Sequence, residues 1–190
     1  MNVYDFDGTV RRGDTSADFY FFALRRHPSM ILDIPRIGWN ALLWKLGRRT
    51  LLQFKEVFFS FLRRLPDTDA EVEAFRRKNE GCIDRWYLDQ VREDDVIITA
   101  SPEFLVAPLC RELTGVTVIG TEVDKKTGKF LGQNCKGEEK VVRMRRRFGD
   151  ASTAQIENFY SDSYSDTPLA LLAHEAFIVS RDCRRSPWKK

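Results

Sequence analysis

Two aspartates near the start of the chain, Asp5 and Asp7, are separated by one residue and follow a short apolar run. If the backbone stays extended there, side chains two residues apart point to the same side, so both carboxylates share one small volume. Like charges held that close need a metal ion, a shared proton or a nearby cation. Gly8 and Thr9 come next, and a glycine lets the backbone pass close to a ligand. The stretch VYDFDGTV therefore indicates a functional site, although an Asp-Gly turn taken alone is common.

Polar side chains also stand at the ends of predicted elements later in the chain. In a doubly wound sheet the carboxyl ends of the strands lie together in one crevice, so we expect these side chains to meet Asp5 and Asp7. Carboxylates from two strands form a hard oxygen site suited to Mg²⁺, which prefers a few carboxylates plus water and substrate phosphate. The residues are Thr99 at the end of one strand, Lys136 at a helix start, and Asp162 and Asp166 after another strand.

The elements that must position these residues alternate between strands and helices, which predicts an α/β fold with a Rossmann-like, doubly wound parallel sheet. Strands are predicted at residues 2–5, 94–101 and 157–166, late in 167–180, and within 115–134, where a strand runs into a β-hairpin. Core helices are predicted after residue 102, at 136–149 and early in 167–180, and the tail after Arg181 is expected to be loose. Between the first two strands, helical periodicity marks residues 15–26, 30–46, 50–64 and 68–89.

The composition limits the classes of protein to consider. A chain of 190 residues holds one good core, or a core plus a small insert. No apolar run reaches the roughly 18 residues of a membrane span, and the four cysteines are scattered without metal-ligand spacing. The net charge of +3 is mildly basic and the arginines are dispersed, which does not favour nucleic acid as a partner. We expect a cytoplasmic protein with reduced thiols.

Taken in order, DFDGTV, VIITAS, KGEEK and YSDSYSD resemble the four motifs of the haloacid dehalogenase superfamily of phosphohydrolases. The resemblance covers residues 1–13 and 90–180. The helical stretch between them takes the place of a cap that closes over the site, as in the phosphoserine phosphatase branch. The resemblance thus implies a catalytic core formed by residues 1–13 and 90–190, with an inserted all-helical cap of residues 14–89.

The resemblance also implies a role for each motif residue. Asp5 is the nucleophile that attacks phosphorus, and Asp7 protonates the leaving oxygen and later deprotonates the hydrolytic water. Lys136 neutralises charge between Asp5 and the phosphate. The phosphoryl group is held by Thr99 and the amide of Ala100. The substrate contacts include Gly8, Thr9, Asp14 and Ser101. The ligands of Mg²⁺ are Asp5, the backbone oxygen of Asp7, Asp162 and Asp166.

Two features of the motifs refine this interpretation. A dehalogenase needs no proton donor two residues after its first aspartate, whereas an ester leaving group benefits from one, so Asp7 favours phosphate chemistry. In the third motif, Lys136 and Lys140 lie four residues apart and would share one face of a helix. We favour Lys136, because it precedes GEE at the helix start, and keep Lys140 as the alternative.

The cap region departs from phosphoserine phosphatases. Those enzymes carry a glutamate shortly after the first motif and a cap arginine, where this chain has Asp14 and a phenylalanine-rich segment. In residues 40–65, aromatic side chains stand among arginines. This indicates either two helices packing their aromatic faces together or a basic, apolar face that meets an anionic membrane. Several stretches, among them RRHPSMILDIP and ITASPEFLVAPL, are similar to bacterial phosphatidylglycerophosphate phosphatases, which leaves peripheral contact with an anionic membrane open.

The sequence therefore predicts a Mg²⁺-dependent phosphatase that hydrolyses a phosphomonoester through an aspartyl phosphate at Asp5. The substrate is either a small phosphorylated metabolite or a phospholipid head-group phosphate. A phosphotransferase of the same superfamily and a non-catalytic phosphate-binding or membrane adaptor are the alternatives. The sequence makes no prediction of the oligomeric state.

Overall fold

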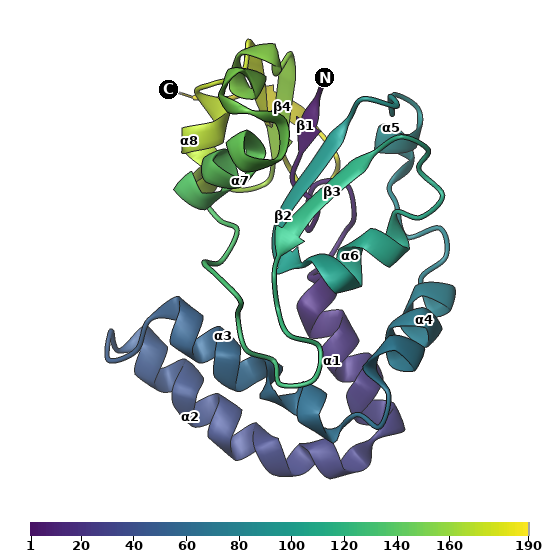
Figure 1. Cartoon of the computed structure of the whole chain (residues 1–190), viewed down its shortest axis with the longest axis vertical. Helices are drawn as coiled ribbons and strands as arrows, with labels where there is room; N and C mark the ends of the chain where they lie inside the picture. Colours follow the sequence, from purple (N-terminus) through teal and green to yellow (C-terminus); the bar gives the residue numbers. More distant parts are fainter. Residues whose placement is uncertain (190) are drawn as a thin grey trace.

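The computed structural model describes residues 1–189 and contains a six-stranded sheet flanked by helices (Figure 1). The strand order is β3-β2-β1-β4-β5-β6, and every neighbouring pair is parallel except β5 and β6. The predicted doubly wound α/β fold with a helical insert is confirmed. The strands are β1 Val3–Tyr4, β2 Val96–Pro102, β3 Thr117–Thr121, β4 Asn158–Ser161, β5 Glu175–Val179 and β6 Arg185–Pro187.

The prediction of a loose tail after Arg181 was wrong. Residues of β6 pair antiparallel with β5, with Arg185 opposite Val179. The ring of Trp188 packs 5.9 Å from that of Phe159, measured between centroids. An edge strand and one partly buried aromatic ring therefore fix a segment whose basic composition suggests an exposed tail.

Alternate side chains of the strands enter two separate cores, as the twofold repeat of a strand requires. Val3, Val96 and Ile98 point to the face covered by α7 and α8, while Tyr4 and Ile97 point to the face covered by α5 and α6. Both faces of the central strands are thus apolar, which explains their unbroken hydrophobic sequence. The helices and turns of this part are α6 Glu103–Leu109, α7 Glu138–Phe148, η3 Asp150–Gln155, η4 Tyr164–Asp166 and α8 Thr167–Ala170.

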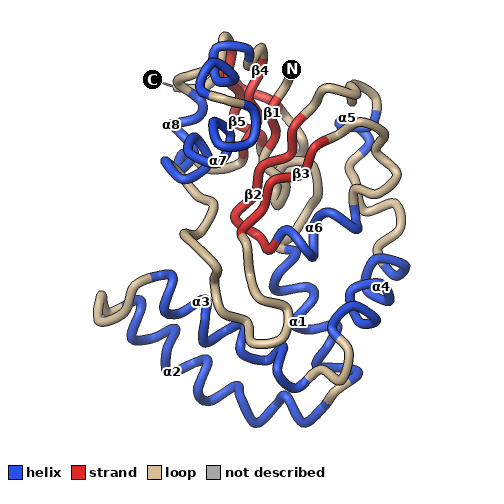
Figure 2. The backbone as a smooth tube through the Cα atoms, viewed as in Figure 1, coloured by secondary structure: helices blue, strands red, loops and turns tan. Residues whose placement is uncertain are grey.

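The stretch between β1 and β2 is helical, and α2 and α3 lie side by side away from the sheet (Figure 2). Its elements are α1 Thr15–Arg26, η1 Pro28–Asp33, α2 Ile34–Lys45, α3 Leu51–Phe59, η2 Ser60–Arg64, α4 Thr68–Lys78 and α5 Arg85–Leu88. Three of the helices have an N-cap side chain: Asp14 caps α1, Asp67 caps α4, and Thr50 forms a capping box with Gln53 at α3. The predicted helix over 68–89 is two helices, because the chain turns at Gly81, where φ is +75°.

The phenylalanines of the insert pack against one another. Phe19, Phe61 and Phe75 are buried together, with the rings of Phe19 and Phe75 edge to face at 5.4 Å. Trp44 of α2 stacks on Phe54 of α3 at 5.4 Å. Aromatic packing between helices therefore accounts for most of these rings. Within residues 1–189, none of the helices has the length and hydrophobicity needed to cross a bilayer.

A long connection, residues 122–135, runs from the end of β3 down to the insert and back toward α7, which begins at Glu138 (Figure 1). The predicted hairpin is present as a single antiparallel bridge between Val123 and Phe130. At its tip Gly128 has φ +74°, and an added Cβ would lie 2.1 Å from the carbonyl oxygen of Phe59. This connection therefore contacts the insert so closely that only glycine fits.

Candidate active site

A cavity of about 480 Å³ lies between the carboxyl ends of the strands and the helices α2 and α3. It is of the size and location expected for a ligand site in an open α/β sheet. The structure brings ten of the sequence-predicted residues to its wall: Asp5, Asp7, Asp14, Thr99, Ala100, Ser101, Lys136, Lys140, Asp162 and Asp166.

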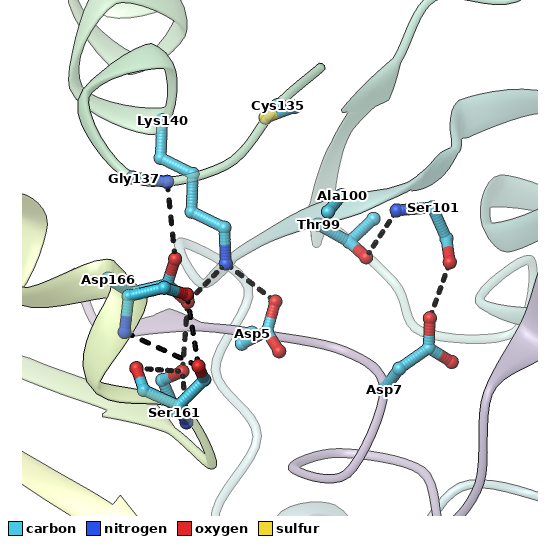
Figure 3. Close-up of polar contacts among 12 residues, drawn as sticks. Asp5, Asp7, Thr99, Ala100, Ser101, Cys135, Gly137, Lys140, Ser161 and Asp166 are labelled. Atoms are coloured by element: carbon cyan, nitrogen blue, oxygen red, sulfur yellow. Dashed lines mark hydrogen bonds and ion pairs between the residues drawn. The ribbon is translucent and has the colours of Figure 1, made fainter. Parts of the chain in front are cut away.

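The most buried charged residues of the cavity wall form an ion triad of Asp5, Lys140 and Asp166 (Figure 3). The Lys140 ammonium donates to Asp5 Oδ1 at 2.6 Å and to Asp166 Oδ2 at 2.7 Å. Ser161 donates to the same Asp166 oxygen at 2.9 Å. Burial lowers the pKa of Lys140, but the two carboxylates outweigh burial and raise it, so Lys140 stays charged. Burial raises the pKa of Asp5 to about 7, against the pull of Lys140.

The position of the lysine differs from the one favoured by the sequence. Lys136 is exposed at the mouth of the cavity, whereas Lys140 is 1% exposed and contacts Asp5. The reason is local: Gly137 has φ +61° and turns the chain before α7, which begins only at Glu138. Lys136 therefore precedes the helix instead of sharing a face with Lys140, and the structure places the alternative residue beside Asp5.

Asp7 lies on the other side of the cavity from the triad (Figure 3). Its carboxylate accepts hydrogen bonds from Ser101 Oγ at 2.5 Å and from the Thr15 amide at 2.8 Å. Burial raises the pKa of Asp7, although these hydrogen bonds favour the charged form and oppose the shift. A carboxyl group with a raised pKa at a cavity wall is suited to giving and taking a proton.

The second predicted motif lies at an irregularity in β2. The pairing of β2 with β3 shifts register between Ile98 and Pro102, so Ala100 leaves the regular ladder. The Thr99 hydroxyl accepts a hydrogen bond from the Ser101 amide at 3.1 Å, while the Ala100 carbonyl accepts from Thr121 Oγ1 at 3.0 Å. The irregular backbone thus presents three consecutive residues to the cavity, as strand irregularities near sites often do.

Gly8 and Thr9 are the two predicted residues that do not line the cavity. Gly8 has φ +77°, and an added Cβ would lie 2.2 Å from Asp162 Oδ2, so glycine allows this carboxylate to lie against the first loop. Thr9 is buried, and its carbonyl accepts a hydrogen bond from Trp86 Nε1 at 3.2 Å. The structure therefore does not support a substrate contact by Thr9, which packs away from the cavity.

The carboxylates fit the donor chemistry of Mg²⁺. Within residues 1–189, no three His, Cys, Asp or Glu side chains form a ready-made cage. Mg²⁺ instead takes one or two carboxylates and fills its other positions with water and phosphate. Asp162 accepts no hydrogen bond from another described residue, and partial burial and the charge of Asp166 raise its pKa. A cation would offset that unfavourable charge, so Asp5 and Asp162 are the side chains that would hold one.

Sequence reasoning missed Lys55, a residue of α3 that reaches the cavity. Its ammonium donates to the Ala100 carbonyl at 3.1 Å and to Asn134 Oδ1 at 2.7 Å. Burial lowers the pKa of Lys55 to about 8. A signal was present: Lys55 has helical spacing from the apolar residues Leu51 and Phe58, so it interrupts an otherwise apolar helix face.

The insert gives the cavity an apolar wall opposite the acids, formed by Trp44, Leu51, Phe54 and Phe58. Asp14, at the start of the insert, accepts a hydrogen bond from the Ala17 amide at 2.9 Å and so caps α1 while lining the cavity. The cavity thus has buried charged residues at the strand ends and aromatic side chains on the wall formed by the insert. Such a cavity can bind a ligand with one strongly anionic end and a less polar remainder.

A family model for haloacid dehalogenase-like hydrolases matches residues 3–171. The chain belongs to this family. The match spans the strands that carry Asp5, Thr99 and Asp162, together with the inserted helices.

The chain is similar in sequence to two bacterial proteins. Protein CicA of Caulobacter vibrioides is 38% identical over 199 residues, covering 91% of this chain and 82% of its own length. A histidinol-phosphatase of Neisseria meningitidis is 31% identical over 100 residues, covering 47% of this chain and 45% of its own length. The family match makes this chain a haloacid dehalogenase-like hydrolase, and one of its partial relatives is a phosphatase.

Solved structures share the fold. A Bordetella pertussis protein of unknown function superposes with a TM-score of 0.76 at 23% identity, covering 93% of this chain and 87% of that one. Phosphoserine phosphatase from T. onnurineus superposes with a TM-score of 0.55 at 17% identity, covering 93% and 81%. At these identities the likeness concerns the fold, which is that of the phosphoserine phosphatase-like proteins.

Proposed function

We propose that this phosphatase hydrolyses a phosphomonoester through an aspartyl phosphate formed on Asp5, with Mg²⁺ as cofactor. One observation carries the proposal. Asp5 ends a strand at the cavity floor, with a charged lysine 2.6 Å from one carboxylate oxygen and a second acid, Asp7, across the cavity. A nucleophile, a cation and a proton donor thus line one cavity, the combination that phosphoryl transfer through an enzyme carboxylate requires.

In the first half of the reaction, a carboxylate oxygen of Asp5 attacks phosphorus and the bond from phosphorus to the alcohol oxygen breaks. Asp7 donates its proton to that leaving oxygen, a role that its raised pKa favours. Lys140 stabilises the negative charge that the phosphoryl group brings to Asp5. Thr99 and the Ala100 amide orient the phosphoryl oxygens for in-line attack.

In the second half, Asp7 is ionised and takes a proton from a water molecule, whose oxygen attacks phosphorus. The bond from phosphorus to Asp5 breaks, which releases phosphate and restores the carboxylate. Ser101 and Thr15 hold the Asp7 carboxylate in place for both halves through their hydrogen bonds. One acid therefore serves both proton transfers without moving between sites.

Asp5, Asp162 and the backbone oxygen of Asp7 would hold Mg²⁺. Asp166 would support the ion directly or through water while it accepts a hydrogen bond from Lys140. When bound, the ion supplies positive charge to the phosphoryl oxygens. A cation is needed at this site, because the single positive charge of Lys140 neutralises only one of the two carboxylates of the ion triad, Asp5 and Asp166.

The charged and aromatic side chains of the cavity wall indicate which class of phosphomonoester can bind. Lys55 and Lys136 are cations beyond the triad, and Trp44 and Phe54 provide an aromatic surface. A phosphomonoester whose alcohol part carries both a polar or anionic group and an apolar portion is complementary to this wall. A small phosphorylated metabolite or a phospholipid head-group phosphate fits that description.

Phosphate release from a panel of substrates tests the proposal. The panel contains phosphoserine, glycerol phosphate, phosphocholine, nucleotides and phosphatidylglycerophosphate, each with Mg²⁺ and with EDTA. We expect Mg²⁺-dependent release from one class, and in Asp5→Asn a rate below about one thousandth of the wild type, because the nucleophile is lost. Release that persists in EDTA, or in a folded Asp5→Asn variant, would overturn the proposal.

A further inference from the structure

Apolar side chains gather on the outer side of η1 and α2, where the surface is exposed. Leu32 is 71% exposed, Trp39 61%, Leu42 45% and Leu46 60%. Single exposed leucines are ordinary on protein surfaces, but a contiguous apolar patch marks an interaction site. The aromatic packing described above leaves these side chains uncovered, so they need a separate explanation.

The spacing of these residues places them in one row. Together with the exposed Pro35, they are three or four positions apart. Pro35, Trp39 and Leu42 therefore lie on one side of α2, with Leu32 in η1 before it and Leu46 directly after it. Trp44 is two positions from both Leu42 and Leu46, hence on the opposite side, where it stacks on Phe54 and lines the cavity. We call the row Leu32, Pro35, Trp39, Leu42 and Leu46 the outer stripe. Because Trp44 stacks on Phe54 of α3, the outer stripe on the opposite side faces away from α3. The helix α2 runs along the edge of the molecule far from the sheet (Figure 1).

Basic side chains border the outer stripe. Residues 31–53 contain four basic side chains, Arg36, Lys45, Arg48 and Arg49, and a single acidic one, Asp33. Asp33 is already ion-paired with Arg64. Lys45, Arg48 and Arg49 are exposed and form no ion pair with any residue from 1 to 189. The surface is therefore apolar along its middle and positively charged along its border.

We propose that the outer stripe is a docking surface for an anionic lipid bilayer, with α2 lying in the plane of the interface. A short helix with an exposed apolar row, a tryptophan and bordering Lys and Arg side chains has the features of an interfacial helix. The basic border is attracted to anionic head groups. A second copy of the chain is the poorer occupant, because a symmetric contact would bring two such basic segments together. The proposal is independent of the catalytic chemistry.

Co-sedimentation of the full chain with lipid vesicles tests the proposal. The vesicles are phosphatidylcholine alone and phosphatidylcholine mixed with phosphatidylglycerol. We expect binding to the mixed vesicles that weakens with salt. The double variant Trp39→Ser/Leu42→Ser should bind at least about tenfold more weakly, since each apolar side chain contributes by burial. The triple variant Lys45→Gln/Arg48→Gln/Arg49→Gln should bind about a hundredfold more weakly, at about fivefold for each charge.

Leu131→Ser/Leu171→Ser is the matched control, because both leucines are exposed and neither belongs to the insert. We expect this control to bind like the wild type, and all variants to keep the wild-type circular dichroism and to hydrolyse a water-soluble substrate as before. Equal binding by Trp39→Ser/Leu42→Ser and the wild type would overturn the proposal. So would equal binding to both kinds of vesicle, or a dimer in solution that the same substitutions dissociate without any vesicle binding.

Discussion

Lys140 is the side chain on which the charge balance of the site depends. It is buried between Asp5 and Asp166, whereas Lys136, in the same motif, is exposed at the cavity mouth. Two buried carboxylates without a cation between them would repel each other and raise their pKa values. The two lysines are chemically identical and differ only in position, so they form a matched pair for mutation.

Lys140→Met should lower kcat/KM by at least about a hundredfold, because the phosphoryl charge at Asp5 loses its nearest cation. It should also destabilise the fold by about 3 kcal/mol, since it leaves two buried carboxylates uncompensated. Lys136→Met should lower kcat/KM by less than about tenfold and leave the unfolding free energy unchanged. Steady-state kinetics and urea unfolding measure both effects. The reverse ranking of the two variants would show that the exposed lysine carries the role.

Lys55 gives the site a predicted pH dependence. Burial lowers its pKa to about 8, so its positive charge is lost as the pH rises through about 8. If this charge attracts the substrate, KM should rise over that range in the wild type and stay flat in Lys55→Arg, because arginine keeps its proton. Lys55→Met should have a raised KM that is flat throughout. A wild-type KM that does not change across this range would remove Lys55 from substrate binding.

At the residue scale, the sequence predicted the identity of the acids but not every partner. Asp5, Asp7 and Asp162 follow strands, and strand ends converge in this class of sheet, so their meeting was predictable. The choice between Lys136 and Lys140 depended on one glycine with positive φ, which decides where α7 begins. Lys55 lies in the insert, and no local pattern says how the insert sits over the sheet.

At the scale of elements, the connection 122–135 links the insert to the core. Arg63 donates to the Thr127 carbonyl at 3.1 Å, and Lys55 donates to Asn134 at 2.7 Å. Gly128 lies between these contacts with its backbone against Phe59. These contacts hold the inserted helices over the strand ends that carry the charged residues of the cavity.

Gly128→Ala should therefore destabilise the protein strongly. Its φ is +74°, and the new Cβ would clash with the Phe59 carbonyl. Gly47→Ala is the control, since Gly47 has φ +69° but open space around it. We expect a loss of about 1 kcal/mol for Gly47→Ala from backbone strain alone and a clearly larger loss for Gly128→Ala. Urea unfolding measures both; equal losses would mean that the connection can move away from Phe59.

The starts of α1, α3 and α4 were predictable, because Asp14, Thr50 and Asp67 are capping residues visible in the sequence. Breaks between helices inside a long stretch of helical periodicity were harder to predict from the sequence. Gly81 divides the stretch over 68–89, and Pro35 stands in the first turn of α2, after the 3₁₀ turn η1. The strand β6 was not predictable, because its pairing depends on a distant neighbour, β5, rather than on its own short basic sequence.

At the scale of the whole molecule, Mg²⁺ should stabilise the folded chain, because only folding brings Asp5 and Asp162 together. A concentration one hundred times the dissociation constant adds about 2.7 kcal/mol. Thermal unfolding with Mg²⁺ and with EDTA should show a higher midpoint with the ion. Asp162→Asn should abolish that difference, and Asp150→Asn, an exposed acid outside the cavity, should preserve it. A difference that persists in Asp162→Asn would place the ion elsewhere.

The central claim is that Asp5 becomes phosphorylated during turnover. The most direct measurement is an acid quench of the enzyme in the presence of Mg²⁺ and its substrate, followed by mass spectrometry of the peptides. We predict one phosphoryl group on Asp5 that hydroxylamine removes and that is absent from Asp5→Asn. Turnover by the wild type with no phosphoryl group on Asp5, or with the group on another residue, would contradict the mechanism.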